Sequence, residues 1–130
     1  MTAPYLRILY SEDDPDAREI VCLILAKEGF ETICPDSSQD VLRIANDQKF
    51  DAYLLDSWTP NMSGVELCKR IKEFDAHTPI IFYSAAAFQA DKDEALAAGA
   101  QAYVTKPSSV EELVDAIRLA ISSSRDIQSE

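Results

Sequence analysis

Short apolar runs alternate with amphipathic segments along this 130-residue chain. The runs of strand length are Arg7–Tyr10, Phe30–Cys34, Ala52–Leu55, Ile80–Tyr83 and Ala102–Thr105. A helical pattern follows each of them, and such alternation favours β-α units, a parallel sheet and helices on both faces of that sheet. The sequence therefore predicts one doubly wound α/β domain with five strands and five helices.

Local signals mark the ends of several helices. Asp14-Pro15 predicts the start of the first helix, and Gly29 predicts its end. Capping boxes at Ser63–Glu66 and Ser109–Glu112 predict the starts of the third and fifth helices. The fourth helix, about Gln89–Ala98, is rich in alanine, which favours a helix but leaves little apolar bulk to anchor it.

The fifth helix is expected to bury an apolar stripe and then to fray. The stripe consists of Leu113, Val114, Ile117, Leu119 and Ala120, and the chain is polar from Ser122 onward. A chain of this length has room for one domain with a sizeable core. We therefore expect a single domain over residues 1–130, with its core at about 5–122 and a polar tail at 123–130.

Charge and hydropathy exclude several classes of protein. The net charge of −11 argues against direct binding of nucleic acid and favours partners with positive or apolar surfaces. No apolar stretch approaches the roughly 20 residues of a membrane helix, and Met1–Tyr5 lacks a signal-peptide pattern. These features predict a cytoplasmic protein without membrane contact. Cys22, Cys34 and Cys68 have no metal-ligand or redox spacing and are predicted to be reduced core thiols.

Polar residues stand where four of the predicted strands end. Asp56 closes the third strand, Glu12-Asp13 follows the first, Ser84 closes the fourth, and Lys106 follows the fifth. The carboxyl ends of parallel strands share one edge of a sheet, so these side chains are expected to converge on one crevice. Three acids, a hydroxyl and a lysine together indicate a site for a divalent metal and a phosphoryl group.

A carboxylate can accept a phosphoryl group when a metal ion and a fixed lysine offset the developing charge. Mg²⁺ prefers one or two carboxylates together with waters, a carbonyl and phosphate oxygens. Glu12 and Asp13 are placed to hold this ion, with Asp56 as nucleophile and third ligand. Lys106 is expected to contact the phosphoryl group or pair with Asp56, and Ser84 to donate a hydrogen bond to a phosphate oxygen.

The chain resembles the receiver domains of two-component response regulators from about Tyr5 to Ser122. Four motifs in the right order carry the resemblance: Glu12-Asp13 with Asp14-Pro15, Asp56 with Pro60 and Gly64, Ser84-Ala85, and Tyr103–Pro107. The resemblance implies a CheY-like, flavodoxin-like fold with strand order 2-1-3-4-5. It also implies a phosphoacceptor signalling domain that catalyses its own phosphorylation and hydrolysis and turns over no external substrate.

By the same resemblance, Asp56 would accept a phosphoryl group from a sensor histidine kinase or a histidine phosphotransfer protein. The metal ligands for Mg²⁺ would be Glu12, Asp13, Asp56 and the backbone carbonyl of Trp58. Ser84 and Lys106 would hold the phosphoryl group.

The resemblance also implies how the signal leaves the site. Tyr103 would be the aromatic switch that turns inward when Ser84 moves, although a strand tyrosine can equally be structural. The Lys106-Pro107 peptide bond is often cis in this family. Output would pass through the face built by the fourth helix, the fifth strand and the fifth helix, and a homodimer could form there.

Three residues depart from the family pattern. Glu12 replaces the first aspartate of the acidic pair, and Trp58 stands where a smaller residue is usual, at the rim of the site. Ala86 offers no group that would orient a hydrolytic water. Together these residues predict slow hydrolysis of the phosphoryl group.

Two other readings stay open. A degenerate receiver that binds partners without phosphorylation is favoured by Glu12 and Trp58 but opposed by Asp56 and Lys106. An enzyme on the same fold has less support, since an aspartyl phosphatase would need a second acid where Trp58 stands, and no Gly-x-x-x-x-Gly-Lys loop occurs. The sole histidine, His77, is expected to be exposed and uninvolved.

Overall fold

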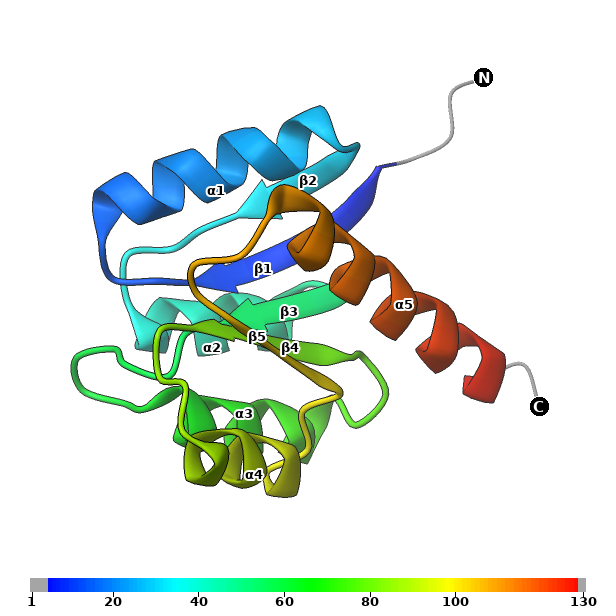
Figure 1. Ribbon diagram of the computed structural model, residues 1–130. Helices are drawn as coiled ribbons and strands as arrows, with labels where there is room; N and C mark the ends of the chain where they lie inside the picture. The colour runs from blue at the N-terminus through cyan, green and yellow to red at the C-terminus, as the bar shows by residue number, and fades with distance from the viewer. Residues whose placement is uncertain (1–4, 129–130) are drawn as a thin grey trace.

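The computed structural model describes residues 5–128 and contains a parallel sheet between two layers of helices (Figure 1). Five strands and five helices alternate along these residues: β1 Leu6–Ser11, α1 Pro15–Lys27, β2 Phe30–Ile33, α2 Ser38–Asp47, β3 Ala52–Leu55, α3 Gly64–Phe74, β4 Ile80–Ser84, α4 Gln89–Ala97, β5 Ala102–Thr105 and α5 Val110–Gln128. The strand order is β2-β1-β3-β4-β5, and every neighbouring pair is parallel. The predicted fold class and strand order are confirmed.

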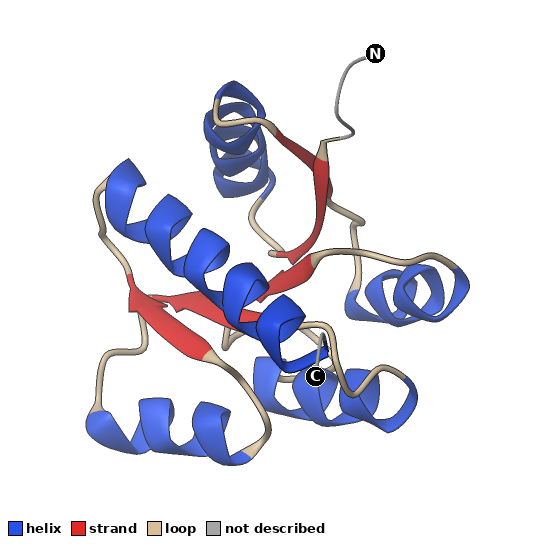
Figure 2. Cartoon of the chain, turned by 90° about the vertical axis from the view of Figure 1, so that its right-hand side faces the viewer, coloured by secondary structure: helices blue, strands red, loops and turns tan. Residues whose placement is uncertain are grey.

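Helices α1 and α5 cover one face of the sheet, and α2, α3 and α4 cover the other (Figure 2). Alternate residues of the central strand β3 pack against the two helix layers, because successive side chains of a strand point to opposite faces. Leu54 packs in the core with α1 and α5, whereas Tyr53 and Leu55 pack in the core with α2, α3 and α4. All three are fully buried, which explains why the strand reads as a continuous apolar run.

The predicted helix starts are confirmed by hydrogen bonds. Asp14 caps α1 by accepting from the backbone N–H of Asp16 at 3.0 Å. Ser63 caps α3 in the same way, accepting from the N–H of Glu66 at 3.1 Å. Such caps satisfy N–H groups that have no partner within the helix, and each typically stabilises a protein by about 1 kcal/mol. Gly29 follows the end of α1 with φ +91°, a conformation that favours glycine.

Two expectations about α5 are wrong. Leu119 does not belong to the buried stripe: its side chain is 69% exposed, because the inward positions of the helix are Leu113, Val114, Ile117, Ala120 and Ile121. The chain does not fray at Ser122 either, since α5 continues through Gln128. The hydroxyl of Ser124 donates to the carbonyl of His77 at 2.7 Å, and Arg125 forms an ion pair with Asp51 at 2.8 Å.

These two contacts fix the last part of α5 against the edge of the domain where the strands begin. The predicted polar tail at 123–130 is therefore helical over 123–128, and Ser129 and Glu130 lie outside the described residues. Met1–Pro4, part of the N-terminus that lacks a signal-peptide pattern, also lie outside them. Among the helices of residues 5–128, none combines the length and apolarity that crossing a bilayer requires.

All three cysteines are free thiols, but only Cys68 is fully buried. Cys22 and Cys34 are half-buried, and the fold brings them together although they lie far apart in sequence. The interaction between the two thiols lowers the pKa of Cys22 and raises that of Cys34. The prediction of reduced core thiols is thus confirmed for Cys68, while Cys22 and Cys34 pack against the core with partial exposure and form a contact that their spacing did not indicate.

Candidate functional site

The acidic and basic side chains meet at the carboxyl edge of the sheet, as predicted. Asp56 follows β3 directly, and its backbone N–H donates to the carbonyl of Ser11 at 3.1 Å. Lys106 follows β5 directly, and its N–H donates to the carbonyl of Ser84 at 2.8 Å. These bonds continue the ladders of the sheet past the strand ends. The backbone under the site is therefore held by the same kind of hydrogen bonds as the sheet.

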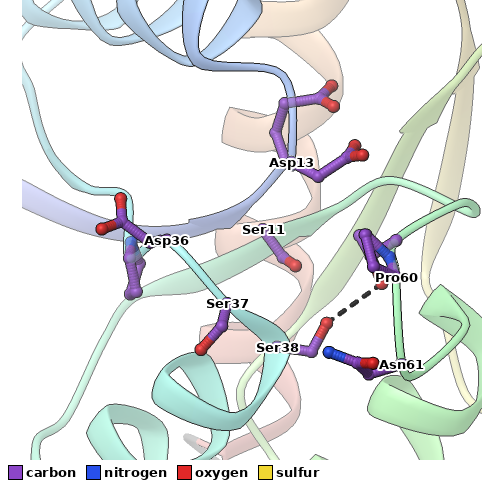
Figure 3. A pocket seen from close by; sticks show the side chains of 10 residues that line it. Ser11, Asp13, Asp36, Ser37, Ser38, Pro60 and Asn61 are labelled. Carbon is purple, nitrogen blue, oxygen red and sulfur yellow. Dashed lines mark hydrogen bonds between the residues drawn. The ribbon is translucent and has the colours of Figure 1, made fainter.

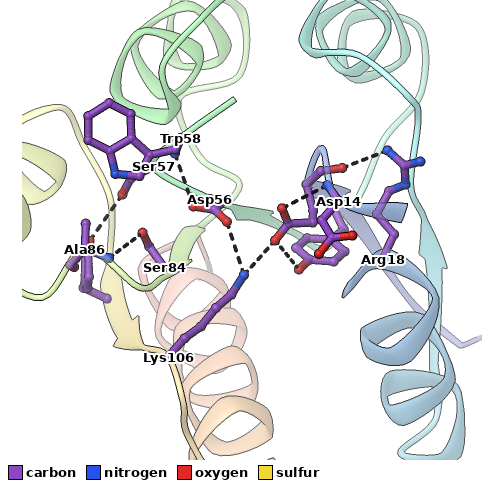
Figure 4. Close-up of polar contacts among 11 residues, drawn as sticks. Asp14, Arg18, Asp56, Ser57, Trp58, Ser84, Ala86 and Lys106 are labelled. Carbon is purple, nitrogen blue, oxygen red and sulfur yellow. Dashed lines mark hydrogen bonds and ion pairs between the residues drawn. The ribbon is translucent and has the colours of Figure 1, made fainter. Parts of the chain in front are cut away.

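Lys106 joins two carboxylates that come from different strand ends (Figure 4). Its Nζ lies 2.7 Å from Oε1 of Glu12 and 3.2 Å from Oδ2 of Asp56. It also lies 5.0 Å from the centre of the Tyr83 ring, which favours a cation electrostatically. Burial alone would lower the pKa of Lys106, but the hydrogen bond to Glu12 and the charges of both acids raise it. The peptide bond from Lys106 to Pro107 is cis, as expected.

Asp56 is a buried carboxyl group, with 9% of the residue exposed. Burial raises its pKa, and the neighbouring Glu12 raises it further, while the charge of Lys106 and the backbone N–H of Trp58 act in the opposite direction. The Trp58 N–H donates to Oδ1 of Asp56 at 3.2 Å. The ionised form is thus costly here, and additional positive charge would stabilise it.

Glu12 is held from several sides. Besides Lys106, the hydroxyl of Tyr10 donates to Oε1 at 3.4 Å, and the backbone N–H of Asp14 donates to Oε2 at 3.3 Å. Arg18 donates to the Glu12 carbonyl at 3.0 Å. Glu12 is 6% exposed as a result, so it belongs to the interior of the site.

Asp13 lies at the open side of the site. Its side chain is exposed and makes no hydrogen bond or ion pair with any residue in the described range 5–128. Within that range, no group of three or more His, Cys, Asp or Glu side chains is arranged to hold a metal ion. The carboxylates of Glu12 and Asp56 face Lys106, and Asp13 stands apart from them at the mouth.

Ser84 and Tyr103 are linked through the loop between β4 and α4. The fully buried Ser84 accepts a hydrogen bond from the N–H of Ala86 at 3.1 Å. The hydroxyl of Tyr103 donates to the Ala86 carbonyl at 2.5 Å and lies 3.2 Å from the hydroxyl of Ser57. The Tyr103 ring stacks on Phe82, with 5.7 Å between centroids and 2° between planes. Tyr103 thus already lies inward, against the loop that contains Ala86.

Trp58 stands at the rim, with 72% of the residue exposed. Its backbone faces the Asp56 carboxylate, but the indole is turned away from that carboxylate, toward the side of the site where Ala86 lies (Figure 4). In this conformation the ring leaves the acid uncovered. Phe88, at the start of α4, is even more exposed, at 80%.

Glycine is required at position 64 because the backbone of Asp56 lies very close to it. A Cβ at this first residue of α3 would collide with the backbone oxygen of Asp56 and would lie 2.9 Å from the ring of Phe82. The N–H of Gly64 also donates to the carbonyl of Ser57 at 3.1 Å. Glycine therefore allows the start of α3 to pack directly against the backbone of the acid.

Three residues of the site were not predicted. Tyr10 contacts Glu12, and its position in β1, two residues before Glu12, could have indicated a shared side of the sheet. Tyr83 lies under Lys106, and Ser57 contacts Tyr103. Ser57 had no signal in the sequence, because its partner is 46 residues away.

Comparison with known proteins identifies the family. The family model of the response regulator receiver domain matches residues 8–118. This chain belongs to that family. The receiver is 37% identical over 107 residues to the uncharacterized transcriptional regulatory protein YrkP of Bacillus subtilis, with 82% of this chain and 46% of YrkP covered. The receiver spans about half the length of the curated relatives that it matches.

Solved structures show the same fold. A CheY-like receiver domain protein from Methanospirillum hungatei superimposes with a TM-score of 0.88 at 25% identity, covering 94% of this chain and 98% of that one. The receiver domain of the sensor histidine kinase PA1611 from Pseudomonas aeruginosa gives a TM-score of 0.84 at 28% identity, covering 91% and 98%. That structure contains a magnesium ion coordinated in the active-site cleft.

Proposed function

We propose that this receiver accepts a phosphoryl group on Asp56 from a sensor histidine kinase or a histidine phosphotransfer protein. The observation that carries the proposal is the contact of Lys106 with both Asp56 and Glu12 at the carboxyl edge of the sheet. An Asp56 carboxylate oxygen attacks phosphorus, the bond from phosphorus to the donor nitrogen breaks, and the electron pair of that bond stays on the donor. Lys106 offsets the negative charge that gathers on the phosphoryl oxygens.

Mg²⁺ fits the chemistry of these residues. Asp56 and Glu12 crowd negative charge in a buried place, which raises the pKa of Asp56 through burial and proximity. The carbonyl of Trp58 accepts no hydrogen bond from residues 5–128, and Asp13 is likewise without a partner there. Glu12, Asp13, Asp56 and the Trp58 carbonyl would hold the ion once Asp13, which stands apart from the other two carboxylates in this structure, turns toward them. Mg²⁺ would supply positive charge at the phosphoryl oxygens.

Ser84 and Tyr103 would carry the signal away from Asp56. A phosphoryl group near Asp56 offers an acceptor to the hydroxyl of Ser84, which now accepts from the N–H of Ala86. Any shift of that loop would reach Tyr103 through its bond to the Ala86 carbonyl. The α4-β5-α5 face would then contact the output partner or a second copy of the chain. Helix α4 suits such a change, because only Ala95 is buried along it.

Output through protein contact rather than direct binding of nucleic acid agrees with the net charge of −11. YrkP is named as a transcriptional regulatory protein, and the receiver matches less than half of its length. We therefore propose that any control of transcription would act through partners or further segments, and not through this domain's own contact with DNA. A cytoplasmic location and an activity limited to self-phosphorylation and hydrolysis are part of the same proposal.

The test is intact mass spectrometry after incubation with a small phosphodonor and Mg²⁺. We expect a phosphoryl adduct on the wild type that is absent from Asp56→Asn and absent without Mg²⁺. An Asp115→Asn variant, which removes an exposed carboxylate of α5, is the matched control and should be phosphorylated normally. An adduct that persists in Asp56→Asn would place the acceptor elsewhere.

A second measurement is the decay of that adduct. Ala86 provides no side chain to orient water near the acyl phosphate, so we predict slow hydrolysis. Ala86→Asn should shorten the lifetime if this reasoning holds, and Trp58→Ala tests whether the indole moves over the site after phosphorylation. Fast decay of the wild-type adduct in Mg²⁺ would refute the prediction.

The alternative function is binding of partners without phosphorylation. It is favoured by Glu12 in the acidic pair and by the exposed Trp58 at the rim. If no adduct forms and beryllofluoride also fails to bind, this alternative replaces the proposal.

A further inference from the structure

A cavity of about 290 Å³ opens beside the acidic site (Figure 3), and it shares with the proposed phosphoryl transfer the two proposed Mg²⁺ ligands Glu12 and Asp13. It is enclosed by the loops that follow β1, β2 and β3. The side chains that matter for its chemistry are Ser11, Asp13, Asp36, Ser38, Pro60 and Asn61. Neither Asp56 nor Lys106 lines it.

Ser11 provides the first evidence for a ligand. It is the last residue of β1 and is 2% exposed, yet its hydroxyl makes no hydrogen bond with any residue of the described range 5–128. Figure 3 shows this hydroxyl directed into the space between Ser38 and Pro60. The hydroxyl itself opens onto the cavity, since among the described residues the fully enclosed side-chain atom without a partner is Thr32 Oγ1. A ligand that displaces water from the cavity therefore has to offer Ser11 a hydrogen bond.

The second piece of evidence is that the cavity offers acceptors. The hydroxyls of Ser38 and Thr59 are 3.0 Å apart, and the Thr59 hydroxyl donates to the carbonyl of Met62. When Thr59 donates to Met62, Ser38 is the donor to Thr59, and the lone pairs of Ser38 are then available to a donor from outside. Asn61 makes no side-chain hydrogen bond with the rest of residues 5–128, so its amide oxygen is available as well.

The charges of the residues that line the cavity determine which ligand charge it favours. Glu12, Asp13 and Asp36 line it, and lysine and arginine side chains do not. Glu12 shares Lys106 with Asp56, and Asp36 has only a 3.5 Å contact with Arg18, whereas Asp13 has no ion-pair partner among the described residues. An anion would be repelled, and an apolar group would leave Ser11 without a partner. A cationic hydrogen-bond donor meets both requirements.

We propose that this cavity binds a guanidinium group, either of a free compound or of an arginine side chain presented by a partner protein. The cavity is near the lower limit for small-molecule sites, and therefore suits a side-chain-sized group. Guanidinium has several donors in one plane, which can pair with acceptors on Ser11, Ser38 and Asn61, and the apolar ring of Pro60 can pack against that plane. Asp13 and Asp36 supply the opposite charge at the rim.

The proposal is tested by NMR on the ¹⁵N-labelled protein in EDTA, without a phosphodonor, so that the outcome is separate from phosphorylation of Asp56. Methylguanidinium is titrated at near-physiological salt, with methylurea as the neutral analogue of the same shape. We expect saturable shifts of the amide resonances of Ser11, Ser38 and Asn61 with methylguanidinium, and none with methylurea. Equal shifts with both compounds, or no saturable shift, would overturn the proposal.

Two variants locate the site. Asp36→Asn should weaken binding about tenfold and Ser11→Ala about threefold, through loss of a charged partner and of a hydrogen bond. Asp36 is well exposed, so its variant should fold normally even if the buried Ser11 variant does not. The matched controls Asp115→Asn and Ser122→Ala alter exposed residues of α5 and should leave the affinity unchanged. If Asp115→Asn weakens binding as much as Asp36→Asn does, binding is diffuse attraction to an acidic surface, which overturns the proposal.

The source of the guanidinium group is distinguished by a third probe, the peptide acetyl-Gly-Arg-Gly-amide. Binding of the peptide at least about tenfold tighter than methylguanidinium would support a partner's arginine, because backbone contacts at the rim then add to the affinity. Equal or weaker binding of the peptide would support a free compound.

Discussion

Lys106 lies closer to Glu12 than to the proposed acceptor Asp56: the distances from its Nζ are 2.7 Å and 3.2 Å. The glutamate in the acidic pair is long enough to reach the lysine, and the side chains of Glu12 and Lys106 are both largely buried. The lysine is therefore shared between a metal ligand and an acceptor in the proposed mechanism. Before a phosphoryl group can take up Lys106, at least one of these contacts has to lengthen.

Replacement of Lys106 should destabilise the fold. In Lys106→Met the carboxylates of Glu12 and Asp56 lose their shared cation, so we expect the free energy of unfolding to fall by about 2 kcal/mol at neutral pH. The deficit should shrink in acid, because protonated carboxyls need no cation. Urea unfolding at neutral and acidic pH measures both effects. Lys69→Met, which removes an exposed lysine of α3, is the matched control, and equal losses in the two variants would contradict the prediction.

Neutralising Asp56 should stabilise the protein. Burial and the nearby Glu12 raise the pKa of Asp56 above the ordinary value of 3.8. Between that value and the raised folded pKa, the folded state binds more protons than the unfolded state, so stability falls as the pH rises through this window and stays reduced above it. The free energy of unfolding of Asp56→Asn should therefore be about 1 kcal/mol larger than that of the wild type near pH 7. This difference should shrink toward pH 4.

Thermal and urea unfolding of Asp56→Asn at several pH values, without Mg²⁺, checks this dependence. Asp115→Asn is the control for the loss of one negative charge from an acidic chain. An advantage of Asp56→Asn that stays constant down to pH 4 would show that its cause is not the titration of Asp56.

Removal of the Tyr103 hydroxyl should loosen the loop between β4 and α4. Tyr103→Phe keeps the stacking on Phe82 but loses the bonds to Ala86 and Ser57, which we expect to cost about 1 kcal/mol. Amide hydrogen exchange should accelerate at Ala86 and in the first turn of α4, while the rest of the sheet stays protected. Tyr5→Phe removes a hydroxyl from a tyrosine that is 70% exposed, and should change neither quantity. Uniformly faster exchange in Tyr103→Phe would indicate a global rather than a local effect.

Substitution of Gly64 should disturb the acceptor directly. In Gly64→Ala, the new methyl group collides with the backbone oxygen of Asp56 and approaches Phe82, so α3 or the loop before it must shift. We expect a loss of about 2 kcal/mol in the free energy of unfolding and slower formation of the phosphoryl adduct. Ser63→Ala at the preceding position removes only the helix cap and tests whether a weakened α3 start alone has the same effect. Adduct formation slowed equally in both variants would contradict the steric explanation.

Much of the fold could be predicted from local signals in the sequence. The strand-helix alternation specified the parallel sheet, because runs such as Ala52–Leu55 are buried on both faces and read as continuously apolar. Asp14, Ser63 and Ser109 marked helix starts correctly, since a cap depends on residues only two or three positions away. The convergence of Glu12, Asp56 and Lys106 followed from the shared edge of parallel strands.

Tertiary structure alone decided the contacts between side chains that are distant in sequence. The sharing of Lys106 between Glu12 and Asp56 joins residues 94 and 50 positions apart, and the pairing of Ser57 with Tyr103 spans 46. The continuation of α5 past Ser122 depends on Asp51 and His77, which no helical pattern within α5 indicates. The unpaired hydroxyl of Ser11 is likewise visible only once three loops enclose it. Periodicity and caps depend on neighbours along the chain, whereas rotamers, burial and charge pairing depend on which elements pack together.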